Sequence, residues 1–328
     1  MRDVILEVKD LKTVFSTYSG KIAAVDNVSF TLGRNETLGI VGESGCGKSV
    51  TARSILKLVE FEGGKIESGT IQYWPSQGDK VDLTALNYRS KQMRDIRGAE
   101  IAMIFQEPMA SFNPVYSIGK QLSEVLTTHK KMSKAEAREV VVNLLDKVKI
   151  PNASRRFEEY PHEFSGGMRQ RAMIVMAILC NPRILIADEP TTALDVTVEA
   201  QILELINTLK TESNMTTMII THDMSVIGEM TDHVMVMYAG RVVEYADSSS
   251  LFANPLHPYT QALLKSIPMI GKKGELYSIE GSVPSLYHLP AGCYFAPRCP
   301  YATALCKKEN PPEFKVDENH LVRCWLYK

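Results

Sequence analysis

The sequence predicts an α/β fold with a mostly parallel sheet, followed by a loop-rich C-terminal extension. Short apolar runs typical of buried strands alternate along the chain with amphipathic helical stretches, and this order is typical of a sheet covered by helices. A glycine-rich phosphate loop joins one such strand to a helix. After about residue 247 the alternation stops and prolines become frequent. These three observations together indicate a nucleotide-binding α/β domain with an appended segment.

Each element of this fold has its own pattern. Residues 133–136 resemble a capping box, with Ser133 and Glu136 three residues apart at the start of a helix. The expected strands and helices are listed here in chain order: a strand at 4–15, a buried strand at 37–41, a helix at 50–59, antiparallel strands at 69–74 and 80–83, helices between 117 and 160, buried strands at 183–188 and 215–223, and a hairpin at 233–245 that turns at Ala239 and Gly240.

Composition excludes several classes of protein. The chain has 328 residues, 45% of them hydrophobic, which is enough for about two structural units. Its formal net charge of −1 gives no basic excess, so we expect no nucleic-acid partner. The densest apolar run, MIVMAILC, is much shorter than the ~20 residues of a membrane helix, and the N-terminus does not resemble a signal peptide. We therefore expect a cytoplasmic protein with reduced thiols.

The segment GESGCGKS, residues 42–49, fits the phosphate-loop pattern G-x-x-x-x-G-K-[ST] in full. Its glycines let backbone N–H groups surround phosphate oxygens, and the following helix points its positive end at the same anion. Lys48 is expected to reach the β- and γ-phosphates, and the Ser49 hydroxyl to coordinate Mg²⁺. A simple glycine-rich turn is the alternative, and the flanking strand and helix disfavour it. The residues of this loop expected to bind ATP are Gly42, Ser44, Gly45, Gly47, Lys48, Ser49 and Val50.

Two further segments have the chemistry of a nucleotide site. In ILIADEP, Asp188 ends a buried strand and is expected to hold Mg²⁺, while Glu189 can activate the attacking water. FSGGMRQR places a Ser-Gly-Gly turn before an apolar helix, which makes a second anion site at a helix N-terminus. Because one nucleotide does not easily need both sites, we infer that Ser165 and Gly167 contact a nucleotide held by another subunit.

These motifs, together with TALD and IITHD, occur in the order and spacing of ABC ATPases, and the resemblance covers residues 4–246. It implies a RecA-like core sheet, an antiparallel β subdomain and a helical subdomain at about 107–170. It also implies a head-to-tail sandwich of two ATPase subunits. Residues 1–246 would form the nucleotide-binding domain and 247–328 the extension. The signature segment departs from the commonest form at Phe164 and Met168, but its Ser-Gly-Gly backbone is intact.

The resemblance also implies roles for single residues. Glu189 resembles the catalytic base, His222 the switch histidine, and Gln106 the glutamine that contacts Mg²⁺ and moves with the membrane partner. Either Phe15 or Tyr18 is expected to stack on adenine, and the sequence leaves this choice open. The residues implied to clamp the partner subunit's ATP are Ser165, Gly166, Gly167 and Asp195.

Segments such as NPLHPYTQALLKSIP and LPAGCYFAPRCPYA resemble a narrower group, the ATP-binding subunits of oligopeptide and dipeptide importers. This implies a heterodimer with a second homologous ATPase subunit, bound to two transmembrane permease subunits at the cytoplasmic face of the membrane. An external solute-binding protein would deliver the peptide. The group also includes nickel and other importers, which stay as alternatives. A non-transport ABC ATPase is less favoured because the chain has one phosphate loop and no coiled-coil insertion. A nucleotide-binding scaffold without turnover is disfavoured by Glu189 and His222.

Four cysteines stand in the extension, at Cys293, Cys299, Cys306 and Cys324. Three interpretations compete: inert buried thiols, a disulfide, and a metal site with either Zn²⁺ or a [4Fe–4S] cluster. A loop-rich segment with little hydrophobic core favours a metal as a structural staple. The importer resemblance favours [4Fe–4S] over Zn²⁺. His288 and His320 could replace a thiol in a zinc site, but both are interpreted as surface histidines.

Overall fold

The computed structural model describes residues 3–106, 111–192, 194–267 and 277–328. The chain falls into two compact units. The first unit comprises Met1–Trp74, Lys80–Ala85 and Ile219–Lys328, and the second comprises Pro75–Asp79 and Leu86–Met218. Among the described residues, no helix is both long and apolar enough to cross a membrane.

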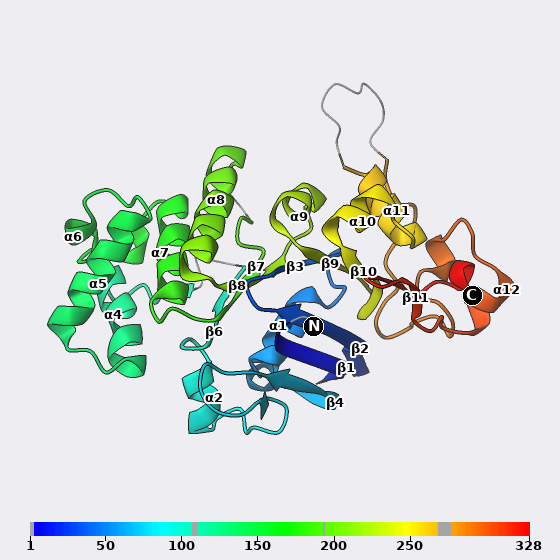
Figure 1. Cartoon of the computed structure of the whole chain (residues 1–328), viewed down its shortest axis with the longest axis horizontal. Helices are drawn as coiled ribbons and strands as arrows, with labels where there is room; N and C mark the ends of the chain where they lie inside the picture. The colour runs from blue at the N-terminus through cyan, green and yellow to red at the C-terminus, as the bar shows by residue number, and fades with distance from the viewer. Residues whose placement is uncertain (1–2, 107–110, 193, 268–276) are drawn as a thin grey trace. The chain divides into compact units, whose positions relative to one another are not determined.

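The first unit begins with an antiparallel sheet in the order β2-β1-β4-β5, and Figure 1 shows β2, β1 and β4 side by side. The strands are β1 (Val4–Thr17), β2 (Gly20–Gly33), β4 (Gly64–Tyr73) and β5 (Val81–Asp82). Apolar side chains recur along β1 and most of them are buried, although its register shifts bury consecutive residues such as Ile5 and Leu6.

The first unit also contains the strands that position the phosphate loop. Their order is β11-β12-β10-β9-β3; β3 is parallel to β9, and the other pairs are antiparallel. These elements are β3 (Thr37–Val41), β9 (His233–Tyr238), β10 (Arg241–Asp247), β11 (Phe314–Asp317), β12 (His320–Val322), the short helical turn η1 (Val59–Glu62), and helices α1 (Lys48–Ile55) and α9 (Met224–Met230). The expected hairpin at Ala239 and Gly240 is confirmed.

The C-terminal extension packs on this sheet, and Figure 1 shows it in yellow to red beyond β10. It adds α10 (Ser248–Ala253), α11 (Pro258–Lys265), α12 (Ala304–Lys308) and the turns η3 (Ala296–Arg298) and η4 (Trp325–Tyr327). Tyr259 and Phe295 of the extension are fully buried against Tyr238 of β9. The expectation of little hydrophobic core in this segment is therefore wrong. Three aromatic rings spaced far apart in the sequence form a shared core that local patterns do not reveal.

The second unit holds the helical part of the chain. Its elements are α2 (Lys91–Ile96), β6 (Ile101–Ile104), α4 (Ile118–His129), α5 (Lys134–Lys147), α6 (Ala153–Arg156), η2 (Pro161–Glu163), α7 (Gly166–Ile178), β7 (Ile184–Asp188), α8 (Val196–Ser213) and most of β8 (Thr216–Ile220). Strand β6 runs parallel to β7. The capping box is confirmed: Ser133 Oγ accepts from the Glu136 N–H, and the Glu136 carboxylate accepts from the Ser133 N–H.

Candidate nucleotide site

The phosphate loop connects the fully buried strand β3 to helix α1. Gly42 and Gly47 have φ angles of +150° and +99°, in the region that favours glycine. A Cβ at Gly42 would lie 2.2 Å from the Met237 carbonyl oxygen, and one at Gly47 would lie 2.4 Å from that of Ala24. Only glycine fits these two positions, because a side chain at either would collide with the backbone of a neighbouring strand.

Lys48 is buried at the start of α1, and its ammonium group stays within the loop. Its Nζ donates to the Gly42 carbonyl at 2.6 Å and to the Glu43 carbonyl at 3.2 Å. Cys46 is buried beside it, and burial raises the pKa of the Cys46 thiol despite the nearby cation. A neutral, buried thiol beside Lys48 indicates packing and no part in the chemistry of the loop.

The two aromatic candidates for adenine stacking lie in different environments. Phe15 is half-buried on β1, and its ring packs so close to Gly64 that a Cβ there would lie 2.7 Å from Phe15 Cε1. Tyr18 is fully exposed at the turn between β1 and β2. His222, in the same unit, is exposed just after β8.

The second unit brings together Gln106 and Glu189, two of the three residues expected to take part in hydrolysis. Gln106 Nε2 donates to Glu189 Oε2 at 2.8 Å, and Thr192 Oγ1 donates to the same oxygen at 3.0 Å. Glu189 has a φ of +47°, an uncommon backbone conformation for a residue with a Cβ, and such conformations cluster at functional sites. Asp188 precedes it and is fully buried at the end of β7.

The signature segment forms an open helix N-terminus. Ser165 caps α7 by accepting from the Met168 N–H, and a Cβ at Gly166 would meet nothing within 4 Å. Gly167 lies against Val198 of α8, whose N-cap is Asp195. The Ser-Gly-Gly turn and Asp195 therefore begin two neighbouring helices, and Ser165, Gly166 and Asp195 are all exposed.

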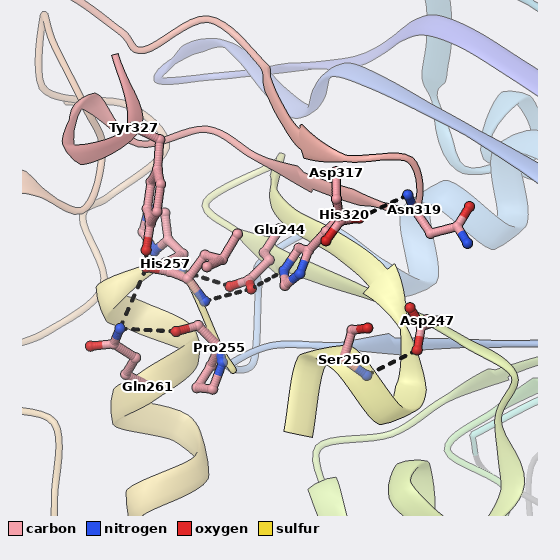
Figure 2. Close-up of polar contacts among 11 residues, drawn as sticks. Glu244, Asp247, Ser250, Pro255, His257, Gln261, Asp317, Asn319, His320 and Tyr327 are labelled. Carbon is pink, nitrogen blue, oxygen red and sulfur yellow. Dashed lines mark hydrogen bonds and ion pairs between the residues drawn. The ribbon is translucent and has the colours of Figure 1, made fainter. Parts of the chain in front are cut away.

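A buried polar cluster lies where the extension meets β10, and Figure 2 shows its members. Glu244 accepts from the backbone N–H groups of Leu256 and His257, and its carboxylate lies 2.7 Å from His320 Nε2. His320 is 2% exposed, so its interpretation as a surface histidine is wrong. Glu244 and His320 are 76 positions apart in the sequence, and only the fold brings them into contact, so no local pattern predicts this buried pair.

The four cysteines of the extension line one cavity of about 110 Å³, together with Tyr301, Thr303 and Trp325. All six cysteines of the chain are free thiols, which disfavours the disulfide. Burial raises the pKa of the Cys293, Cys299 and Cys324 thiols, the last to about 11. In the described part of the chain, however, no group of three or more His, Cys, Asp or Glu side chains has an arrangement that could hold a metal ion. Four thiols are suitable ligands for a soft metal, but in the described residues they are not arranged around one metal position.

Sequence reasoning missed the residues that contact the phosphate loop from the extension. Arg298 pairs with Glu43, and Tyr259 accepts from the Glu43 N–H. Tyr259 lies in the segment NPLHPYTQALLKSIP and Arg298 in LPAGCYFAPRCPYA. Both segments resemble the ATP-binding subunits of oligopeptide and dipeptide importers. Nothing in the sequence links these segments to the loop, which lies more than 200 residues earlier.

Comparisons with known proteins identify the family of the chain. The sequence profile of the ABC transporter family matches residues 25–192, and that of the oligopeptide/dipeptide transporter C-terminal region matches 243–306. The chain is 50% identical to a putative peptide import ATP-binding protein of Brucella ovis, covering 98% of this chain and 97% of that protein. It is also 50% identical to the oligopeptide transport ATP-binding protein AppD of Bacillus subtilis, covering 99% and 97%.

Solved structures show the same fold. A dimeric ATP-binding cassette, MJ0796, in a post-hydrolysis state bound to ADP and Pi, matches with a TM-score of 0.64 at 25% identity. The match covers 74% of this chain and 98% of MJ0796. The expected P-loop ABC ATPase fold is confirmed. The chain therefore belongs to the ABC transporter family, among the ATP-binding subunits of the oligopeptide and dipeptide type, and is an ATPase.

Proposed function

We propose that this protein is the ATP-hydrolysing motor subunit of a membrane importer and that it couples ATP binding and hydrolysis to the uptake of dipeptides and oligopeptides. The observation that carries the proposal is the likeness to peptide-import ATP-binding proteins over nearly the whole chain, extension included. Import of nickel or another solute is the alternative, because the chain holds the motor and substrate choice would be made by other subunits.

Within this function the residues have distinct roles. Lys48 and the backbone of the phosphate loop would bind the phosphates, and Ser49, Asp188 and Gln106 would hold Mg²⁺. A bound Mg²⁺ would supply positive charge that neutralises the phosphate oxygens. Glu189 accepts a proton from the attacking water, and the amide of Gln106 at 2.8 Å fixes the orientation of its carboxylate. His222 contacts the γ-phosphate. These roles are those that the resemblance to ABC ATPases implies, and we assign them to the residues whose surroundings are described above.

The second half of the proposal concerns partners. Ser165, Gly166, Gly167 and Asp195 are exposed or half-buried at two helix N-termini, so that they are available to a nucleotide held by a second ATPase subunit. We propose a homologous subunit as that partner. Two transmembrane permease subunits would hold the pair at the cytoplasmic face of the membrane, and an external solute-binding protein would act through them. The domain division at residue 246, with a helical subdomain at about 107–170, belongs to the same proposal.

The experiment that tests the proposed function uses a Glu189→Gln variant. The amide cannot accept the proton from water, so we expect ATP hydrolysis by the full transporter to fall at least about a hundredfold while ATP binding persists. In cells lacking the gene, the wild-type chain should restore uptake of a labelled tripeptide and the variant should not.

Two outcomes would contradict the proposal. Hydrolysis that stays at the wild-type rate in Glu189→Gln would remove the catalytic assignment. Uptake of labelled nickel, but not of peptide, that depends on the gene would replace peptide import by the alternative. Gln201→Glu is a matched control on α8, because it exchanges the same two side chains at an exposed position outside the proposed site.

We propose in addition that Cys293, Cys299, Cys306 and Cys324 hold a metal that staples the extension, with a [4Fe–4S] cluster favoured over Zn²⁺. The support is that all four thiols line one small cavity. Thiols bind metal only after losing their protons, and burial raises the pKa of Cys293 and Cys324, so metal affinity should fall as the pH is lowered. Because the described residues contain no group arranged to hold a metal, the four thiols would have to move closer together when the metal binds.

A further inference from the structure

Glu43, the second residue of the phosphate loop, forms a two-pronged ion pair with the C-terminal extension. Arg298 Nη1 lies 2.7 Å from one carboxylate oxygen, and Arg298 Nη2 lies 3.1 Å from the other. The arginine side chain is 4% exposed and the glutamate side chain 30%. Paired hydrogen bonds of this kind are both stronger and more directional than a single contact. They join two residues that are 255 positions apart in the sequence.

Arg298 is held in place by more than its partner. Its guanidinium also donates to the Tyr238 hydroxyl at 3.3 Å and to the carbonyls of Glu280 at 3.0 Å and Ile279 at 3.3 Å. The bond to Glu43 and the contact with Tyr238 raise the pKa of Arg298 above its ordinary value, so the group stays charged. The ring of Phe295 lies 6.0 Å from the guanidinium carbon. The folded extension therefore fixes a positive charge at one position.

The backbone of Glu43 is also held by two hydrogen bonds. Its N–H donates to the Tyr259 hydroxyl at 2.9 Å, and its carbonyl accepts from Lys48 Nζ at 3.2 Å. Tyr259 is fully buried on α11, in the extension. Two side chains of the extension thus meet one loop residue, Arg298 at its carboxylate and Tyr259 at its amide. This residue directly follows Gly42, at the start of the cradle for the phosphates.

A carboxylate in this position opposes the function of the loop. The loop collects backbone N–H groups and a lysine around a polyanion, and an uncompensated Glu43 would repel that anion across a short distance. The paired guanidinium cancels the repulsion, because the carboxylate then presents little net charge. Partial burial makes this effect larger than for a surface ion pair, since the pair is less screened by solvent.

We propose that Arg298 is a positioning residue for nucleotide binding, through which the folded C-terminal extension neutralises Glu43 and sets the affinity of the phosphate loop for ATP. The proposal rests on nucleotide binding by this loop. It gives the extension a direct role at the nucleotide, in addition to any role in holding a metal or a partner subunit.

The test measures the dissociation constant of Mg-ATP by calorimetry for the full-length chain and four variants. Arg298→Gln exposes the carboxylate, so we expect the constant to rise about fivefold. Adding Glu43→Gln to that variant removes the charge and should return the constant to within about twofold of the wild type. Arg298→Lys keeps the positive charge without the paired geometry and should fall between the wild type and Arg298→Gln. Arg323→Gln is the control, since Arg323 lies in the same extension but pairs with Glu313.

Each result decides the proposal. An Arg298→Gln chain that melts at the wild-type temperature and binds ATP with wild-type affinity overturns it. So does a double variant that binds as weakly as Arg298→Gln alone, because Arg298 would then act by folding the extension and not through the charge of Glu43. Equal losses in Arg298→Gln and Arg323→Gln would also overturn it. A wild-type chain that binds no nucleotide would instead remove the proposed function itself. If Arg298→Gln does not fold, Arg298→Lys takes its place. A raised dissociation constant that returns towards the wild type when Glu43→Gln is added supports the proposal, and wild-type affinity in Arg298→Lys overturns the assignment of Arg298 as a positioning residue.

Discussion

His257 is a buried side chain of the extension whose titration makes the stability of the folded protein depend on pH. Its ring caps α11 by accepting from the Tyr259 N–H through Nδ1, and its backbone N–H donates to the Glu244 carboxylate. Burial lowers the pKa of His257 to about 4, although the carboxylate of Glu244 acts in the opposite direction. The ring is therefore neutral in the folded protein throughout the physiological range.

The residue-scale prediction concerns the stability of the folded protein in acid. Unfolded His257 takes up its proton near pH 6.5, but the folded protein resists protonation until about pH 4. The unfolded state binds more protons in this window, so the contribution of His257 is fully present above pH 6.5 and is lost as the pH falls towards 4. It amounts to about 3 kcal/mol of the free energy of unfolding.

Urea unfolding of the full chain at several pH values measures this contribution. His257→Asn keeps a side chain that can cap α11 but cannot titrate, so its free energy of unfolding should depend less steeply on pH between 6.5 and 4. His288→Asn is the matched control, because His288 is exposed and should leave the slope unchanged. The same slope in the wild type and in His257→Asn would contradict the prediction.

At the residue scale, the sequence predicts those site residues whose role is written into a local pattern. Lys48 and Ser49 are identified because the loop needs them at a fixed spacing from its glycines, and Asp188 because it ends an apolar strand. Arg298 and Glu244 have no such pattern. Their roles depend on partners 255 and 76 residues away, and only folding brings those partners within hydrogen-bonding distance.

The hairpin of β1 and β2 carries the element-scale prediction, which concerns adenine binding. The structure separates the two candidates by exposure: Phe15 packs on Gly64 of β4, whereas Tyr18 is fully exposed at the turn. A ring that stacks on a base must be able to present its face to it. We expect Tyr18→Ala to raise the dissociation constant of ATP about tenfold, with an unchanged melting temperature.

Phe15→Ala should behave in the opposite way. It removes a ring from the packing between β1 and β4, so we expect it to lower the free energy of unfolding by about 2 kcal/mol with little change in ATP affinity. Calorimetry with ATP and thermal melts of the two variants, compared with Phe61→Ala as an exposed aromatic control, give both quantities. A larger loss of affinity in Phe15→Ala than in Tyr18→Ala would reverse the assignment.

Apolar periodicity predicts long elements well, but it does not predict very short ones. Helix α5 combines apolar periodicity with a capping box, and both signals survive in the structure. Strand β12 has only three residues, and its pairing with β10 gives no alternation long enough to recognise. The predicted loop-rich extension therefore proved to share a sheet and an aromatic core with the rest of the first unit.

At the scale of the whole molecule, the extension raises the question of how it is stabilised. Buried side chains such as Phe295 already attach its first half to the sheet, so a metal is not needed for that contact. The segment from Cys299 to Cys324 has fewer such contacts: of its residues only His320, Val322 and Cys324 are buried. If a metal staples the extension, its effect should be confined to this later segment.

The last prediction follows from that division. Protein purified without oxygen should contain about four iron and four sulfide per chain for a [4Fe–4S] cluster, or one zinc without sulfide. Cys299→Ser should lose the metal and make the chain after about residue 299 sensitive to protease, while the ATPase domain stays resistant. Cys180→Ser is the control and should keep the metal, because Cys180 is a buried cysteine of the second unit.

Absence of metal from the wild type would remove the staple, and four free thiols would then line the cavity as packing. Full metal content in Cys299→Ser would show that the ligands are other residues. Neither result would alter the ATPase assignment, because the phosphate loop, Asp188 and Glu189 lie outside the extension.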